Sequence, residues 1–271
     1  MKEKNSGKVV ELRVKRPIPE WRIALAMPGG NLLEESPSRL WLAPAKLYDG
    51  SDAMLYLKEL DEKRLLVHLL CAAVGHALAC PCPPAFLVMA QPGHYGPSKA
   101  GFTFLFGSYS ANHPDVARPL YDPTLIVQNL KQAKMLELAC VFDEWIANPN
   151  RLGQRMLFGS RSGPLFIDHD HAISPMIEAT NTVKNWLLDE YKASLDEKEL
   201  PNLFQALRRG AARAQDVVLT TDMSNALYWL GQGAERLAEM TAFLSSRLDE
   251  LDKLLSERAI PSQSYIGGVA S

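Results

Sequence analysis

The first hundred residues alternate short apolar runs with turn residues, and this pattern limits the fold more than any other feature of the sequence. The runs are separated by pairs such as Pro28-Gly29 and Asp49-Gly50. Apolar runs of this length bounded by Gly, Pro, Asn and Asp are typical of antiparallel strands. They cover residues 9–14, 21–27, 39–48, 54–60, 86–90 and 101–108. We therefore predict a small antiparallel sheet in this part of the chain.

Helical spacing replaces the strand pattern in two places. Apolar residues recur at helical intervals from Asp61, and the prolines that begin at Pro81 predict that this helix ends by residue 79. After residue 110 most of the chain is helical in pattern, except for two short runs around Gly159–Gly163 that predict a β-hairpin. The later helices are predicted at residues 125–147, 178–192, 196–209, 213–230 and 233–258.

The order of these elements predicts an α+β protein with two lobes. Residues 1–110 would form an N-terminal lobe, a sheet with the helix 61–79. Residues 111–260 would form a helical C-terminal lobe that contains a loop and hairpin at 148–171. Residues 261–271 have the composition of a flexible tail.

Charge and composition exclude several classes of protein. The 271 residues include 29 Lys and Arg against 31 Asp and Glu, a net charge of −2, so the basic surplus of a nucleic-acid-binding protein is missing. No apolar run is long enough for a membrane span or a secretion signal. The four cysteines are too few for a disulfide framework. These features predict a cytoplasmic protein with reduced thiols.

The segment 142–173 combines the residue types that phosphoryl transfer needs. It reads FDEWIANPNRLGQRMLFGSRSGPLFIDHDHAI and places a carboxylate, Asp168, directly after an apolar strand. A loop residue can orient the acceptor hydroxyl, while a carboxylate at a strand end holds magnesium against the phosphates of ATP. One or two carboxylates together with the phosphates suffice for Mg²⁺. Asp168 is therefore the candidate metal ligand and catalytic residue.

The sequence resembles the kinase domains of the HipA-like family. FDEWIANPNR, MLF and PLFIDH are similar to the family's catalytic segment, in which a Phe-Asp-x-Trp-x-x-Asn helix end precedes Asp-Arg and, after a hairpin, Ile-Asp-His. LYLKEL resembles the strand with the ATP-contacting lysine, and residues 64–88 and 101–108 resemble the helix and strands that follow. The resemblance covers roughly residues 8–175. It implies a two-lobed kinase fold, ATP and magnesium as cofactors, and a role for Lys58 on the phosphates.

Three positions depart from the family pattern. The aspartate that would orient the attacking hydroxyl is replaced by Asn150, and the metal-binding asparagine by Arg155, unless the register shifts to place Gln154 there. The helix glutamate that pairs with the lysine is replaced by His68, which can still hydrogen-bond near Lys58. A guanidinium repels magnesium, but it can bind a phosphate directly.

Two functions follow from the resemblance and its departures. The first is an ATP-dependent kinase of the protein Ser/Thr type with degenerate motifs, in which Asn150 orients the acceptor while Arg151 and Arg155 neutralise phosphate charge. The second is an inactive pseudokinase that binds a partner protein, and a nucleotide, without turnover. The three replacements favour the second, because an asparagine amide cannot take a proton at neutral pH.

The segment that would cover the phosphates leaves two alternatives open. The sequence Pro28-Gly29-Gly30-Asn31 is ordinary turn chemistry but is also compatible with a glycine loop. Ser36 and Ser38 could instead supply hydroxyl and backbone donors to the phosphates.

A third function comes from the residue types in Asp168-His169-Asp170-His171. Histidines and carboxylates together bind zinc, manganese or iron, which would suit a metal-dependent hydrolase. On an extended segment, however, the two carboxylates and the two imidazoles would lie on opposite faces. This interpretation therefore needs a further ligand from elsewhere in the chain.

Overall fold

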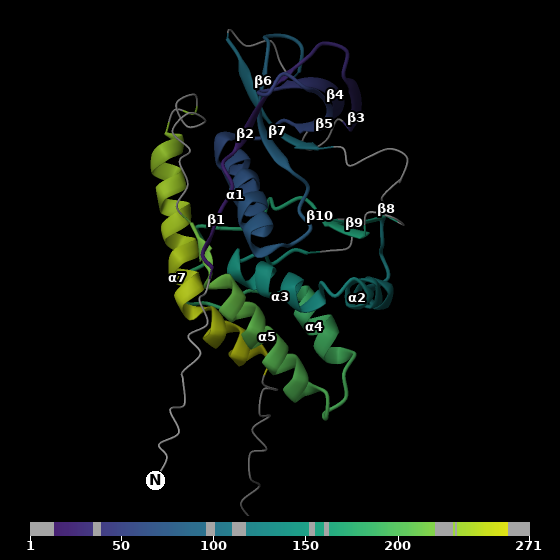
Figure 1. Ribbon diagram of the computed structural model, residues 1–271, viewed down its shortest axis with the longest axis vertical. Helices are drawn as coiled ribbons and strands as arrows, with labels where there is room; N and C mark the ends of the chain where they lie inside the picture. The colour runs from purple at the N-terminus through teal and green to yellow at the C-terminus, as the bar shows by residue number, and fades with distance from the viewer. Residues whose placement is uncertain are drawn as a thin grey trace, which may run out of the picture.

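The computed structural model describes residues 14–34, 39–95, 101–109, 118–151, 155–159, 163–219, 230 and 232–259. The protein has a mixed α+β fold, as the sequence predicts. The strands of residues 22–109 gather at one end of the molecule, and most of the helices gather at the other (Figure 1). Helix α1 lies between these two regions (Figure 1).

The N-terminal strands close into a five-stranded barrel rather than the predicted antiparallel sheet. The barrel order is β2-β6-β7-β5-β4, and β4 pairs back with β2. All pairs are antiparallel except β2 with β6, while β3 lies outside the ring against β4. The strands are β2 (Arg22–Ala26), β3 (Asn31–Glu34), β4 (Leu40–Leu47), β5 (Asp52–Lys58), β6 (Ala85–Ala90) and β7 (Thr103–Tyr109).

Small residues inside the barrel explain why it closes. Alanines of β2, β4 and β6 point inward and are almost fully buried, beside larger side chains such as Leu57 and Phe86. A Cβ atom on Gly107 would lie 2.4 Å from a methyl carbon of Val88, so the Val88 side chain occupies the space beside Gly107. A ring of only five strands has little room inside, and these small residues fit it.

Alternation along β5 decides which way its lysine points. Leu55 and Leu57 are fully buried inside the barrel, so Tyr56 and Lys58 lie on its outer surface. Lys58 is the last residue of the strand, level with Leu40 of β4 and Phe106 of β7. The lysine therefore stands at the rim of the barrel, facing the rest of the protein.

Helix α1 (Glu62–Leu78) confirms the predicted helix at 61–79. The Asp61 side chain accepts a hydrogen bond from the Arg64 backbone N–H and caps the first turn. The helix ends at Ala79, which has left-handed backbone angles. Most of its residues are buried, and it packs against β6, β7 and α7. Its core continues into the helical region as one hydrophobic cluster.

The predicted helix 125–147 is wrong, because two helices form there. Helix α2 (Pro123–Gln132) begins at an Asp122 cap, and α3 (Leu136–Trp145) begins after Lys134, whose φ is +57°. Both helices contact α4, and α3 also packs against α5 and α7. The chain turns at Lys134, and periodicity alone did not reveal this break.

Three of the four helices predicted after residue 175 correspond to helices in the described residues, two of them with shifted bounds. They are α4 (Trp186–Ala193), α5 (Leu200–Ala214) and α7 (Gly233–Ala259). Of these, α7 matches the prediction at 233–258. The helix predicted at 213–230 is wrong at its start, because Val217–Val218 form strand β11, which pairs in parallel with β1 (Arg16–Pro17). Residues 220–229, most of the run 9–14 and the tail 261–271 lie outside the described residues.

The predicted hairpin is confirmed. Strands β9 (Met156–Gly159) and β10 (Gly163–Phe166) pair antiparallel, and β8 (Arg118–Pro119) adds a third strand beside β9. The N–H of Phe166 donates to the carbonyl of Pro81, so the hairpin is tied to the segment after α1. The four cysteines are free and buried. None of the helices in the described ranges is long and apolar enough to cross a membrane.

Candidate functional site

Lys58 forms the centre of a cluster of charged side chains. Its Nζ atom lies 2.7 Å from Oδ1 of Asp168 and 3.0 Å from Oδ2 of Asp170. The lysine ends β5, whereas both aspartates follow β10, 110 and 112 residues later in the chain. The cluster therefore joins the rim of the barrel to the segment that leaves the hairpin.

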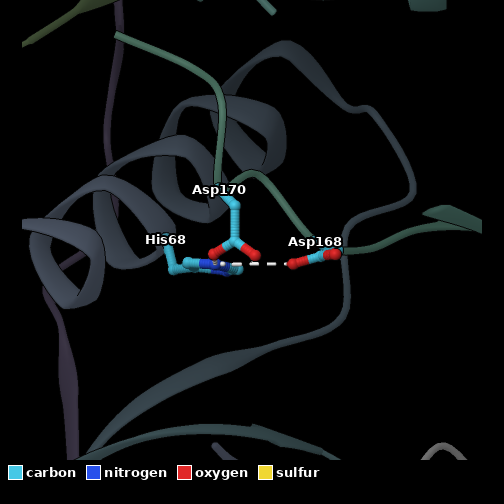
Figure 2. Close-up of side chains that lie close together, drawn as sticks. All are labelled: His68, Asp168 and Asp170. Carbon is cyan, nitrogen blue, oxygen red and sulfur yellow. Dashed lines mark hydrogen bonds and ion pairs between the residues drawn. The ribbon is translucent and has the colours of Figure 1, made fainter. Parts of the chain in front are cut away.

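His68 of α1 closes the cluster from the other side. Its Nε2 atom lies 2.6 Å from Asp170 Oδ1 and 3.6 Å from Asp168 Oδ1, and both carboxylates point toward the ring (Figure 2). The ring is 1% exposed and packs against Phe106, with the two ring centroids 4.8 Å apart. The structure thus brings together the predicted residues Lys58, His68 and Asp168.

Arg155 joins the same cluster through Asp168. The Nε atom of Arg155 is 3.3 Å from Asp168 Oδ2, and its Nη1 donates to the backbone carbonyl of Asn150 at 3.2 Å. The N–H of Asn150 in turn donates to the side chain of Asn148. The position that sequence reasoning assigned to a metal-binding asparagine therefore holds a cation paired with the candidate metal ligand.

The backbone around Asp168 is held on both sides. The N–H of Ile167 donates to the carbonyl of Arg155, and the Ile167 carbonyl accepts from Arg151 Nη1 at 3.0 Å. Asp168 itself has a φ of +57°, a left-handed conformation that costs free energy for a residue with a Cβ. The surrounding hydrogen bonds fix this turn.

Arg151, for which the sequence predicts a role in neutralising phosphate charge, does not reach solvent. It is 1% exposed, and its guanidinium makes a bidentate ion pair with Asp143, with a closest distance of 2.7 Å. Its other donors go to the carbonyls of Arg155 and Ile167 and to Nδ1 of His169. In this structure Arg151 is a positioning residue behind the cluster.

The charges of the cluster balance one another. Two cations, Lys58 and Arg155, face two carboxylates, Asp168 and Asp170. Burial alone would raise the pKa of Asp170, but the hydrogen bond from His68 and the charge of Lys58 outweigh burial and hold this pKa well below its usual range. Asp170 is therefore a carboxylate at neutral pH.

The same side chains can hold a metal ion. The donor atoms of His68, Asp168 and Asp170 all lie within 4.8 Å of one another. Carboxylate oxygens suit Mg²⁺, so the two aspartates fit the magnesium that the sequence predicts. Such an ion would have to take the place of the Lys58 ammonium between the carboxylates.

Asp170 is the residue that sequence reasoning left out of the nucleotide site. It entered there only as part of the hydrolase alternative, although its two-residue spacing from Asp168 was a usable signal. Neither histidine of that segment belongs to the three-residue group, and His169 is buried against Arg151. The segment therefore brings only its carboxylates to the cluster.

Ser36 and Ser38 lie outside the described residues. The strands on either side of them, β3 and β4, pair with Glu34 opposite Leu40, and Leu40 lies opposite Lys58. The described ends of these strands are thus level with the lysine. Gly30 of the alternative glycine segment donates its N–H to the Tyr95 hydroxyl.

The chain matches no family model and no curated protein. Its function is therefore argued from the residues of the site.

We predict that replacing Arg151 with leucine destabilises the fold by about 3–5 kcal/mol, because Asp143 becomes a buried charge without a partner. The double variant Asp143→Asn/Arg151→Leu should be less destabilised than Arg151→Leu alone, since it removes both charges. Urea denaturation of the three proteins measures this difference. Equal losses in the single and double variants would contradict the pairing.

We also predict a stability change with pH that comes from His169. Burial holds the pKa of His169 well below its ordinary value of 6.5, and the charge of Arg151 lowers it further. The unfolded chain therefore binds a proton below pH 6.5 that the folded protein does not. The free energy of unfolding should therefore decrease as the pH is lowered below 6.5, by about 1 kcal/mol for each pH unit.

The variant His169→Gln keeps an acceptor for Arg151 but cannot titrate. Its urea denaturation between pH 7.5 and 5.5 should show a flatter dependence than that of the native chain. Some slope should persist, because burial also lowers the pKa of His76. The same slope in both proteins would show that His169 is not the group responsible.

Proposed function

We propose that this protein is a kinase-like nucleotide-binding protein, an ATP-dependent phosphotransferase in type, with its site at the cluster around Lys58 and Asp168. The observation that carries the proposal is the 2.7 Å ion pair between these two residues, which come from distant parts of the chain. A lysine for the phosphates and a strand-end carboxylate for the metal are the two groups that phosphoryl transfer requires close together.

The order of the elements supports this proposal. A strand with the lysine, helix α1, two further strands, a helical region and a hairpin with the aspartate follow one another as the resemblance to HipA-like kinase domains implies. On this proposal the barrel and α1 form the N-terminal lobe, and the helices after residue 118 form the other. The closed barrel is a departure from the open sheet that the sequence predicts.

The outer surface of the barrel beside Lys58 offers a surface on which the purine base of ATP can bind. Leu40, Leu42 and Tyr56 are neighbours on β4 and β5, and all three are only partly covered, with Tyr56 37% exposed. Apolar and aromatic side chains next to a few polar groups are typical of cofactor sites. The proposed site thus combines an apolar surface with a charged end.

Charge balance predicts that nucleotide and metal bind together. The cluster is already neutral, so a divalent cation alone would add two positive charges and compete with Lys58. A polyphosphate brings the missing negative charge. On this proposal Lys58 leaves its carboxylates for the phosphates, while Asp168 and Asp170 hold the cation that neutralises charge on the transferred group.

Asn150 stands at the position where the family pattern has the aspartate that orients the acceptor hydroxyl. On the proposal the acceptor is a Ser or Thr hydroxyl of a protein, oriented by Asn150, whose amide can donate or accept a hydrogen bond but cannot remove a proton. Positioning and charge stabilisation contribute most to phosphoryl transfer, so loss of the base slows the reaction without abolishing it. Arg155 would contribute charge near the phosphates once Asp168 has a metal.

A second candidate is an inactive binding or regulatory protein of the same fold. The observation that favours it is the ion pair between Arg155 and Asp168, which places a fixed cation at the metal ligand. In this case the nucleotide would stabilise the fold and present a surface to a partner protein. The two candidates share the nucleotide site and differ only in turnover.

We predict that ATP with Mg²⁺ raises the melting temperature of the native chain by several degrees, whereas either one alone has a smaller effect. In Lys58→Met the ATP effect should be lost, but the metal alone should now stabilise the protein, because a competing cation is gone. Thermal denaturation with each ligand and with both tests this. Lys46→Met is the matched control, since Lys46 is an exposed lysine of β4 paired with Asp52. No shift with ATP in any condition would overturn the nucleotide site.

Labelling with radioactive ATP separates the two candidates. If the protein is a slow kinase, the native chain labels itself or a general protein substrate, Asp168→Ala abolishes the labelling, and Asn150→Asp increases it about 10²-fold or more by restoring a base. If it is inactive, neither the native chain nor Asn150→Asp incorporates label. Labelling that survives Asp168→Ala would contradict both candidates.

A further inference from the structure

His68 brings a nitrogen ligand to a site where magnesium would normally meet only oxygen. Its Nε2 atom faces both carboxylates, at 2.6 Å from Asp170 and 3.6 Å from Asp168 (Figure 2). The ring is almost completely buried and is held against Phe106. The nitrogen is therefore a fixed part of the site and not a mobile surface group.

The donor set distinguishes between metals. Mg²⁺ prefers oxygen ligands, and it keeps several waters in an octahedral shell. Imidazole suits first-row transition metals such as iron and zinc, and a mixed set of one imidazole with carboxylates is compatible with Mn²⁺, Co²⁺ and Zn²⁺. The three donor atoms lie within 4.8 Å of one another, close enough to contact one ion from the same side.

We propose that His68, Asp168 and Asp170 form a three-ligand site that selects a transition-metal ion over magnesium, and that His68 is the residue responsible for this selection. The remaining coordination positions are open to phosphate oxygens or water. This proposal deepens the proposed function. It rests on that function only where it names phosphate oxygens as further ligands, because the choice of metal rests on the donor set alone.

Two changes in the cluster accompany metal binding. His68 Nε2 lies at hydrogen-bond distance from a carboxylate, so in the neutral ring this atom carries the proton. Metal binding requires the other tautomer, in which the proton is on Nδ1 and the Nε2 lone pair faces the ion. The Lys58 ammonium also leaves the space between the carboxylates.

The surroundings of the ring set the expected strength. Nδ1 of His68 is buried and has no hydrogen-bond partner among the described residues. Metal-bound histidines usually donate this second N–H to a carboxylate or carbonyl, and loss of such a partner costs about 10- to 100-fold in affinity. We therefore expect a weak, exchangeable ion and not a permanently bound one.

The test uses the native chain of 271 residues and the variant Lys58→Met, in which the competing cation is absent. Each is titrated with Mn²⁺, Co²⁺ and Mg²⁺ without nucleotide. Electron paramagnetic resonance follows Mn²⁺, visible absorption follows Co²⁺, and competition with Mn²⁺ reports Mg²⁺. We expect Mn²⁺ and Co²⁺ to bind at least about tenfold more tightly than Mg²⁺ in Lys58→Met, and Co²⁺ to give the absorption of a site with nitrogen ligation.

The variant His68→Gln on the same background should reduce this preference for Mn²⁺ over Mg²⁺ by about tenfold or more, because an amide oxygen replaces the nitrogen. His76→Gln is the matched control, since His76 lies two turns further along α1 and is absent from the three-residue group. Urea denaturation confirms that each variant is folded, and His68→Asn serves if His68→Gln is not.

An unchanged metal preference in His68→Gln, or equal binding of Mn²⁺ and Mg²⁺ in Lys58→Met, would overturn the role of His68. Neither outcome affects the nucleotide site, which the thermal shift with ATP tests separately. Conversely, a clear His68-dependent preference in a protein that never responds to ATP would keep the metal site and remove the proposed function.

Discussion

The buried ion pair between Asp143 and Arg151 holds in place the loop and the hairpin beside the candidate site. Asp143 belongs to the last turn of α3, and Arg151 lies in the loop that follows. Both side chains are 1% exposed, so each charge would be very costly without the other. The same guanidinium also donates to the carbonyls on either side of the hairpin and to His169. One residue therefore fixes the loop, the hairpin and the turn that carries Asp168.

A second buried ion pair begins at the residue after Asp143 and connects α3 to α7. Glu144 and Arg247 of α7 are both fully buried, with 3.0 Å between their charged atoms. Arg247 also donates to the backbone carbonyl of Glu144, and Trp145 donates to the carbonyl of Leu244. Consecutive residues of α3 thus face the site on one side and α7 on the other. This explains why a short segment, Phe142–Trp145, is almost wholly buried although it contains two acids.

The cluster beside the Asp143–Arg151 pair is neutral, because its cations and its carboxylates are paired with one another. Lys58 comes from the barrel, His68 from α1, and the carboxylates from the segment after the hairpin. Attraction among these groups joins three separate parts of the chain, so a ligand that exchanges partners within the cluster acts on all three. That property suits an enzyme and a binding protein equally well, which is why turnover must be decided by the acceptor side of the site.

Apart from Lys58, which only the resemblance singled out, the sequence by itself determined the mixed fold, the helix at 61–79, the hairpin and Asp168 as a candidate site residue. Each of these rests on a local pattern: alternation, helical spacing, turn residues, or a carboxylate after an apolar strand. Only the tertiary structure decided the rest. The barrel closes because small side chains from separate strands meet inside it, and the predicted helix at 125–147 is broken at Lys134, so that α3 packs against α5 and α7. Arg151 is buried, and Asp170 and Arg155 join the cluster, because each one's partner is supplied by another part of the chain. Local patterns show how a residue relates to its neighbours in sequence; the choice of partner for a charge depends on which distant groups share its low-dielectric surroundings.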